Sequence, residues 1–442
     1  MLSAAMVGVL VAMTAPLSAE LRVGVARADI TPPLGGAMYG YGARGSNTST
    51  GVHDPLYAKV LVASAGGETV ALVTLDLGAF EKDRAARVQQ AVERETGIDH
   101  VLLVASHSHS APSYELDFPS ADRPYARSAE AAIVAAVVQA KDRLAPARLA
   151  VGWGRAEEGH NRRQVREDGT VHMLWGNRER VPTSPVDYAV GVVAFDSLAG
   201  APLATLVNFN THPVVLGPEN LEISADYPGA MMAKIESDIG GQAMFVQGAA
   251  GDINPFWDKT APADGGFEQM SAMGEALATE VIRVRAELGP GGDVERLSVV
   301  TEEVALEPRW DLDSPEVEAA FRANEFGWIF ERYRTRFARE SQAEINTVLF
   351  DDRLAVGTFP GEFFVEHGLR FKDQSMVTNT LFVGYTNGAL AYFPTIRAAA
   401  EGGYGGKEAT LVEVGAGDKL INRALVRIHE QLGKLSAIPT FE

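Results

Sequence analysis

The chain has no cysteine among its 442 residues. Disulfide bonds, a thiol nucleophile and a thiolate metal site are therefore excluded, and any metal must be held by His, Asp, Glu or, more rarely, Tyr. Basic residues are also scarce: 39 Lys and Arg stand against 58 Asp and Glu, which gives a net charge of −19. Such a charge argues against nucleic acid or an anionic membrane surface as the main partner.

Charged side chains are missing from the first 19 residues, where an apolar run ends at Pro16 and small residues precede Glu20. This pattern predicts a secretory signal peptide over residues 1–19, with cleavage near Ala19, and therefore a secreted or periplasmic protein. The segment contains no Lys or Arg, which leaves a single membrane anchor as the alternative. No second apolar run of about 18 residues follows, so no further membrane span is expected.

Segments of strand and helix character alternate along the rest of the chain. Strands are predicted at residues 21–30, 58–63, 69–75, 100–105, 148–151, 188–195, 204–209, 243–247, 297–306, 347–358 and 380–385. Helices are predicted at 82–96, 125–144, 228–239, 267–288, 362–372 and 420–435, with a helix-rich insertion over 314–344. This alternation indicates an α/β protein, which we expect to consist of mixed β-sheets flanked by helices.

Two of the nine histidines, His107 and His109, directly follow the predicted strand 100–105. On an extended backbone, residues two apart face the same side, so both imidazoles can point into one pocket. Imidazole is a good zinc ligand, and a His-x-His pair is a known zinc-binding arrangement. The structural alternative is a pair of polar loop residues that cap a turn. The Asp-His pair that follows His-x-His in one group of metal hydrolases is absent here, which argues against that group.

Three further predicted strands end in polar residues, which is where functional groups gather in open α/β sheets. His212 follows the strand at 204–209, Asp252 and Asn254 follow the strand at 243–247, and Glu362 follows the strand segment 354–358. Each has a structural alternative: a cap or turn for His212, a tight turn for residues 247–255, and a favourable helix N-terminus for Glu362. Singly, none of them defines a function.

Together and in order, these segments resemble the N-terminal catalytic domain of the neutral/alkaline non-lysosomal ceramidases. The most specific pieces are Ser106 to Pro112, which match [ST]-H-[ST]-H-S-[GA]-P, and Gly251 to Pro255, which match G-D-[VI]-S-P except at one position. The other matching elements are Gly24 to Thr31, Gly51-Val52-His53, Asn161-Arg162, His212, Pro360 to Phe363, and Thr386-Asn387 through Tyr392. The resemblance covers residues 21–436, so residues 20–442 are expected to form a single large catalytic domain.

The resemblance implies one zinc ion per chain, with His107, His212, Glu362 and Tyr392 as ligands. Zinc lowers the pKa of its bound water to about 7, which supplies hydroxide at neutral pH for attack on an amide carbonyl.

A second set of residues is implied to act in catalysis: His109, Arg162, Asp252, Asn254 and Tyr392. In this interpretation His109 stabilises the oxyanion or carries a proton, Arg162 anchors a substrate oxygen or orders the site, and Asp252 orients a ligand or the water.

Two departures from the family bear on the substrate. Asn254 stands where the family has Ser, and an amide is a poor nucleophile; a route through zinc-bound hydroxide needs no side-chain nucleophile and survives the change. The C-terminal β-sandwich domain that usually follows in the family is expected to be absent from this chain.

The function expected from the sequence is that of a secreted zinc-dependent amide hydrolase that cleaves ceramide or a related N-acyl lipid. One alternative is a zinc hydrolase for a different ester, amide or lactone, and another is a non-catalytic zinc-dependent binding protein. The expected partner is a lipid or small-molecule N-acyl substrate, with no nucleic acid and at most peripheral membrane contact.

Overall fold

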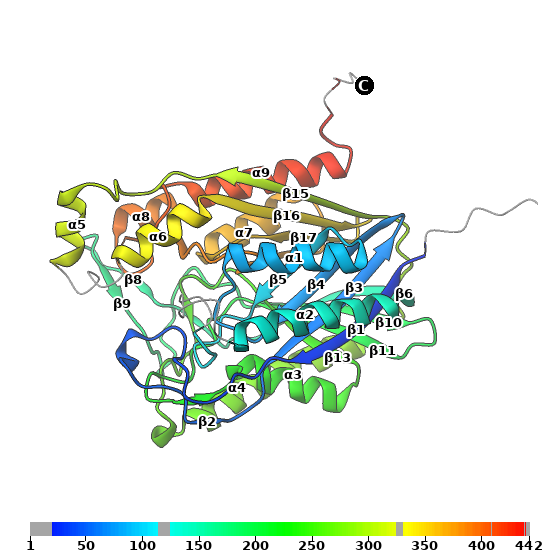
Figure 1. Ribbon diagram of the computed structural model, residues 1–442, viewed down its shortest axis with the longest axis horizontal. Helices are drawn as coiled ribbons and strands as arrows, with labels where there is room; N and C mark the ends of the chain where they lie inside the picture. Colours follow the sequence, from blue (N-terminus) through cyan, green and yellow to red (C-terminus); the bar gives the residue numbers. More distant parts are fainter. Residues whose placement is uncertain (1–19, 114–123, 324–329, 408, 437, 439–442) are drawn as a thin grey trace, which may run out of the picture.

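The computed structural model describes residues 20–113, 124–323, 330–407, 409–436 and 438 (Figure 1). The predicted signal peptide, residues 1–19, lies outside these ranges. Within them, no helix combines the length and the apolar character that a membrane crossing requires.

The larger of two main sheets has eight strands in the order β13-β11-β10-β6-β1-β3-β4-β5. Neighbouring strands are antiparallel except for the pairs β4–β5 and β11–β13, which are parallel. The strands are β1 (Arg22–Asp29), β3 (Tyr57–Ala65), β4 (Glu68–Leu75), β5 (His100–Ala105), β6 (Ala145–Arg155), β10 (Ala189–Ser197), β11 (Pro202–Phe209) and β13 (Gln242–Gln247).

The smaller sheet has four strands in the order β15-β16-β17-β19: β15 (Leu297–Ala305), β16 (Gln342–Phe350), β17 (Leu354–Thr358) and β19 (Thr380–Val383). The prediction of one strand over 347–358 was wrong, because β16 and β17 form an antiparallel hairpin with a turn between them. The turn contains Asp351 at a φ of 50°, a left-handed conformation that Asp adopts more readily than most residues. The turn is so short that the apolar residues of β16 and β17 form almost one continuous run in the sequence, and this is why a single strand was predicted.

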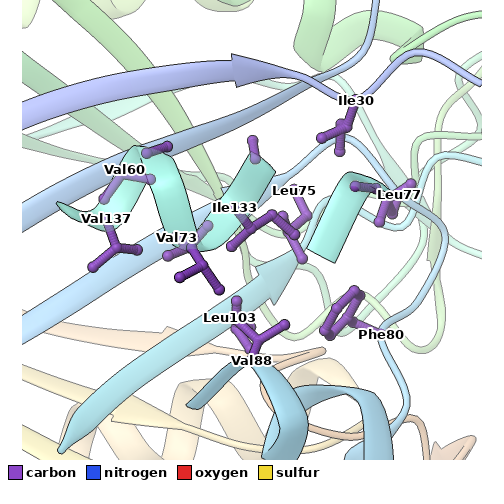
Figure 2. Packing of buried hydrophobic residues seen from close by; sticks show 14 of the residues in the cluster. Ile30, Val60, Val73, Leu75, Leu77, Phe80, Val88, Leu103, Ile133 and Val137 are labelled. Atoms are coloured by element: carbon purple, nitrogen blue, oxygen red, sulfur yellow. The ribbon is translucent and has the colours of Figure 1, made fainter. Parts of the chain in front are cut away.

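Helices cover the outer face of each sheet, which gives four layers (Figure 1). On the large sheet, α1 (Lys82–Thr96) and α2 (Pro124–Asp142) cover one half, and α3 (Asp226–Asp238) and α4 (Gly266–Glu287) cover the other. Figure 2 shows the first of these contacts, where Val88 of α1 and Ile133 of α2 pack against Val73 and Leu103. On the small sheet, α6 (Phe330–Glu340), α7 (Val365–Gln374) and α9 (Ala416–Gln431) form the cover.

The inner faces of the two sheets meet in an apolar core. Leu61, Leu206 and Val246 of the large sheet and Val348 and Leu381 of the small sheet belong to one buried cluster. Strands with both faces covered read as continuous apolar runs, which is why so many of them could be located in the sequence. The mixed sheets with flanking helices that the sequence predicts are confirmed.

Short strand pairs lie outside the main sheets. The pair β18 (Glu362–Phe363) and β20 (Tyr392–Phe393) is parallel, and the pair β14 (Ile253–Asn254) and β7 (His160–Asn161) is antiparallel. The prediction that Glu362 lies in the first turn of a helix was wrong, since α7 begins at Val365. The remaining elements are β2 (Gly51–Val52), β8 (Arg163–Val165), β9 (Val171–Met173), β12 (Glu222–Ile223), α5 (Pro315–Arg322) and α8 (Ile396–Glu401), with 3-10 turns at Gly42–Arg44 and Pro262–Asp264.

The carboxyl ends of β5, β13, β17 and β19 meet at one place between the two sheets. Ala105 N–H donates to the carbonyl of Tyr385, Gly384 N–H donates to the carbonyl of Gln247, and Phe359 N–H donates to the carbonyl of Val383. Three parallel pairs, β4–β5, β11–β13 and β17–β19, therefore deliver the residues that follow them to a shared edge.

Candidate metal centre and active site

Three ligand-type side chains converge at this edge. His107 follows β5, His212 follows β11 and Glu362 follows β17, so the first two come from the large sheet and the third from the small one. One ligand atom from each lies within 4.8 Å of the other two, and the two imidazoles are fully buried. The sequence prediction that these three residues form one cluster agrees with this geometry.

The hydrogen bonds of the two imidazoles show why this cluster suits a cation. Nδ1 of His107 lies 2.7 Å from the carbonyl oxygen of Gly78, and Nδ1 of His212 lies 3.1 Å from that of Ile253. Each Nδ1 therefore carries the proton, and each Nε2 presents a lone pair. These Nε2 atoms lie 3.5 and 3.1 Å from Oε2 of Glu362. Three potential ligand atoms therefore face one another at these distances, and a metal ion among them would accept a lone pair from each.

Burial and charge favour the protonation states that bind a metal. Burial lowers the pKa of His212 to about 4, so its imidazole is neutral near pH 7. For Glu362, burial raises the pKa, but the neighbouring His107 and His212 outweigh burial and hold the pKa well below its ordinary value. Two imidazoles and one carboxylate form the donor set of many catalytic zinc sites.

The backbone at His107 is not extended, contrary to the expectation from the strand pattern. Its φ is 70°, in the left-handed region, which is uncommon for a side chain of this size. The two rings converge because of this turn: Nε2 of His109 lies 3.2 Å from Nε2 of His107. A metal bound by Nε2 of His107 would therefore lie close to the His109 ring.

His109 is enclosed by aromatic rings. Tyr39 and Tyr41 contact its imidazole edge to face, with centroids at 5.3 and 4.8 Å. Burial, and after it the neighbouring His107 and His212, lower the pKa of His109 well below its ordinary value. Its Nδ1 is buried and has no hydrogen-bond partner in the described part of the chain.

Arg162 and Asn254 form a second group beside the cluster. The guanidinium donates to the carbonyl of Gly251 at 2.7 Å and to Oδ1 of Asn254 at 3.1 Å. Burial lowers the pKa of Arg162, but Tyr392 outweighs burial, so the pKa lies above its ordinary value and the side chain stays cationic. Its Nε has no partner among the described residues. Arg162 and Asn254, both implied by the family resemblance to act in catalysis, are thus in direct contact.

Asp252 does not touch the three-ligand cluster directly. Its carboxylate accepts from Val365 N–H at 2.8 Å and from the Asn161 side chain at 2.7 Å. It thereby links the segment after Glu362 to the residue before Arg162. Burial raises its pKa to about 6. These contacts are compatible with the expected role of Asp252 in orienting a neighbouring group.

Tyr392 lies next to Glu362, since β18 and β20 pair these two residues in register. Its ring is buried and lies 5.4 Å from the Arg162 guanidinium carbon. This position fits either of the roles expected for Tyr392, as a metal ligand or as a catalytic group.

Four residues at the site were not predicted from the sequence. Trp175 and Tyr404 flank Arg162, with ring centroids 5.1 and 5.3 Å from its guanidinium carbon. Nζ of Lys259 lies 4.3 Å from the Trp175 centroid and pairs with Asp258. Tyr385 packs on His107 with centroids 4.3 Å apart. Of the four, only Tyr385 carried a sequence signal, because it ends a predicted strand.

Comparisons with known proteins agree with this geometry. The model of the neutral/alkaline non-lysosomal ceramidase N-terminal domain matches residues 21–282, more than half of the chain. The neutral ceramidase from Pseudomonas aeruginosa is 19% identical, with a TM-score of 0.74 over 96% of this chain and 76% of that one. A ceramidase solved in complex with C2 is 18% identical, with a TM-score of 0.75 over 96% and 77%.

Structural similarity at such low sequence identity establishes only that the fold is shared. A comparison with curated proteins found no match to the chain. The family match rests instead on the sequence of residues 21–282, which includes His107, His109, Arg162 and His212. The chain belongs to the neutral/alkaline non-lysosomal ceramidase family, a family of hydrolases.

Proposed function

We propose that the protein is a secreted, zinc-dependent amide hydrolase that cleaves the N-acyl bond of ceramide or a related lipid. The observation that carries the proposal is the set of three facing lone pairs on His107, His212 and Glu362, with both Nδ1 atoms committed to backbone carbonyls. One of the similar structures is a ceramidase in complex with C2, and this supports a lipid substrate for the present chain.

The donor set fits one zinc ion, with Tyr392 adjacent as the proposed fourth ligand. When bound, zinc supplies a hydroxide at neutral pH and polarises the carbonyl that is attacked. The remaining chemistry belongs to the side chains. Arg162 is a buried cation with an unpaired Nε–H, so it binds a substrate oxygen. His109 lies beside the cluster with a spare ring nitrogen, so it exchanges a proton with the substrate.

The place of Asn254 supports a mechanism without a side-chain nucleophile. Its Oδ1 accepts from Arg162 and its amide donates to the carbonyl of Trp175 at 3.4 Å, so the residue holds the guanidinium in place. In this proposal the attacking group is water. This difference from the family Ser leaves a different amide, an ester or a lactone as the second candidate substrate class.

Metal analysis combined with a substrate panel tests the proposal. The purified protein is expected to contain about one zinc per chain, and His107→Ala is expected to lose both the zinc and the activity, because a structural cation site loses most of its affinity with one ligand. His172→Ala is the matched control, since His172 is exposed on β9 and far from the proposed ligands in sequence. The panel contains short-chain ceramide, N-acyl amino acids, fatty esters and lactones.

Three outcomes contradict all or part of the proposal. Full activity in a metal-free preparation removes zinc from the mechanism. Bound zinc without hydrolysis of any member of the panel favours a zinc-dependent binding protein instead. Cleavage of esters or lactones but not of amides keeps the zinc and replaces the substrate.

A further inference from the structure

Tyr385 has a buried hydroxyl group that no described residue satisfies. The side chain is 3% exposed, and its oxygen has no hydrogen-bond partner among the described residues. A buried hydroxyl without a partner loses its hydrogen bonds to water and gains none in return, so such groups are rare in folded proteins. The hydroxyl of Tyr227 shows the usual arrangement in this protein, since it donates to the carbonyl of Thr211.

The backbone at Tyr385 is held in an unfavourable conformation. Its φ is 53°, in the left-handed region, which is strained for an aromatic residue. Its carbonyl accepts from Ala105 N–H at 3.1 Å, and its N–H donates to the carbonyl of Gly361 at 3.3 Å. These partners lie two residues before His107 and one residue before Glu362. Strain that the surroundings maintain in this way is a recurrent property of functional sites.

The side chain of Tyr385 lies at the ligand cluster. Its ring packs on the His107 ring with centroids 4.3 Å apart and planes inclined by 32°. Burial raises the pKa of Tyr385 well above its ordinary value, and the Glu362 carboxylate raises it further. Tyr392, the other buried phenol next to Glu362, lies against the Arg162 guanidinium instead. Tyr385 therefore places a phenol with an uncommitted O–H donor against the His107 ring.

We propose that the Tyr385 hydroxyl donates a hydrogen bond to the carbonyl oxygen of the scissile amide, and that this bond strengthens as negative charge develops on that oxygen. The inference rests on the proposed hydrolase function and adds a catalytic residue to it. The phenol keeps its proton throughout, and no bond to Tyr385 forms or breaks. A donor already fixed in a water-poor site stabilises the developing charge without reorganisation.

The variant Tyr385→Phe removes only the hydroxyl. Loss of one oxyanion donor commonly lowers kcat by a factor of about 100 to 1000, so a fall of that order is expected, with KM nearly unchanged. A phosphonate analogue of the substrate, which carries a charged tetrahedral centre, is expected to bind more weakly by a similar factor. The zinc content is expected to stay at the wild-type value.

Stability of the metal-free protein gives a readout that does not depend on activity. Because the hydroxyl has no partner, its removal is expected to leave the Tm unchanged or to raise it. Tyr125→Phe is the matched control: the Tyr125 hydroxyl on α2 donates to the carbonyl of Ile30 at 2.7 Å, so this variant is expected to lower the Tm and to keep full activity.

If Tyr385→Phe keeps the wild-type kcat and the wild-type affinity for the phosphonate, the inference about Tyr385 is wrong, whereas the proposed hydrolase function is unaffected. Loss of zinc in this variant also overturns it, since Tyr385 is then a ligand, and a fall in Tm like that of Tyr125→Phe assigns it a structural role. A wild-type protein that holds no zinc and cleaves no member of the substrate panel overturns the proposed function and the inference together.

Discussion

Gly40 leaves room for the His109 imidazole, and this offers a way to move that ring without replacing it. A Cβ atom at Gly40 would lie 2.3 Å from Nδ1 of His109 and 2.4 Å from its Cγ. Ordinary contact begins at 3.4 Å, so in Gly40→Ala the imidazole must move by about 1 Å. The rings of Tyr39 and Tyr41 on its other edges limit where it can go.

A displacement of this size at a catalytic group lowers the rate by a factor on the order of 100. Gly40→Ala is therefore expected to lose about that factor in kcat. The zinc content is expected to stay the same, because the three atoms nearest to the new methyl group all belong to His109, which is not a proposed ligand. The φ of +92° at Gly40 adds a stability cost of about 1 kcal/mol for any L-residue.

Gly35→Ala separates the two effects. Gly35 has a φ of +84°, and a Cβ there meets nothing within 4 Å. The control variant therefore carries the same backbone cost without moving His109. The assay compares kcat, zinc content and urea unfolding of the two variants. Equal kcat in Gly40→Ala and Gly35→Ala would refute the reasoning, because the position of His109 would then be irrelevant to turnover.

Two further predictions concern other properties of buried side chains. His109→Ala is expected to retain zinc and to lose turnover, measured by metal analysis and initial rates; loss of zinc instead makes His109 a ligand equivalent to His107. Burial raises the pKa of Asp76 to about 7, so between about pH 4 and pH 7 the folded protein binds a proton that the unfolded chain releases. The contribution of Asp76 to stability therefore falls by about 1.4 kcal/mol per pH unit as the pH rises. Urea unfolding at pH 5 and pH 7 is expected to show this slope in the wild type relative to Asp76→Asn, and equal slopes contradict it.

The strands and the main ligand candidates were predictable because a buried strand appears as an apolar run and the functional residues directly follow such runs. Apolar runs identify strands buried on both faces, and the polar residues that follow β5, β11 and β17 are His107, His212 and Glu362. The structure brings these three together although more than 250 residues separate the first from the last. The family resemblance added Arg162 and Tyr392, whose own segments carry no such signal.

The aromatic part of the site could not be predicted in the same way. Trp175 and Tyr404 lie in segments with no regular apolar spacing. They belong to the site only because they contact Arg162, which lies elsewhere in the sequence. Tyr385 reads as the last apolar residue of a strand, and its left-handed backbone has no sequence signal in a residue that rarely adopts it. The helix expected at Glu362 failed because pairing with Tyr392 extends the backbone there.

The origin of the ligands in two different sheets has a consequence for folding. His107 and His212 follow strands of the large sheet, whereas Glu362 follows a strand of the small one, and the apolar core between the sheets holds them at bonding distance. An ion bound by all three residues acts as a cross-link between the two layers. The Tm is then a function of free zinc concentration, with about 1.4 kcal/mol of stability added for each tenfold increase above the dissociation constant. A chelator is then expected to lower the Tm.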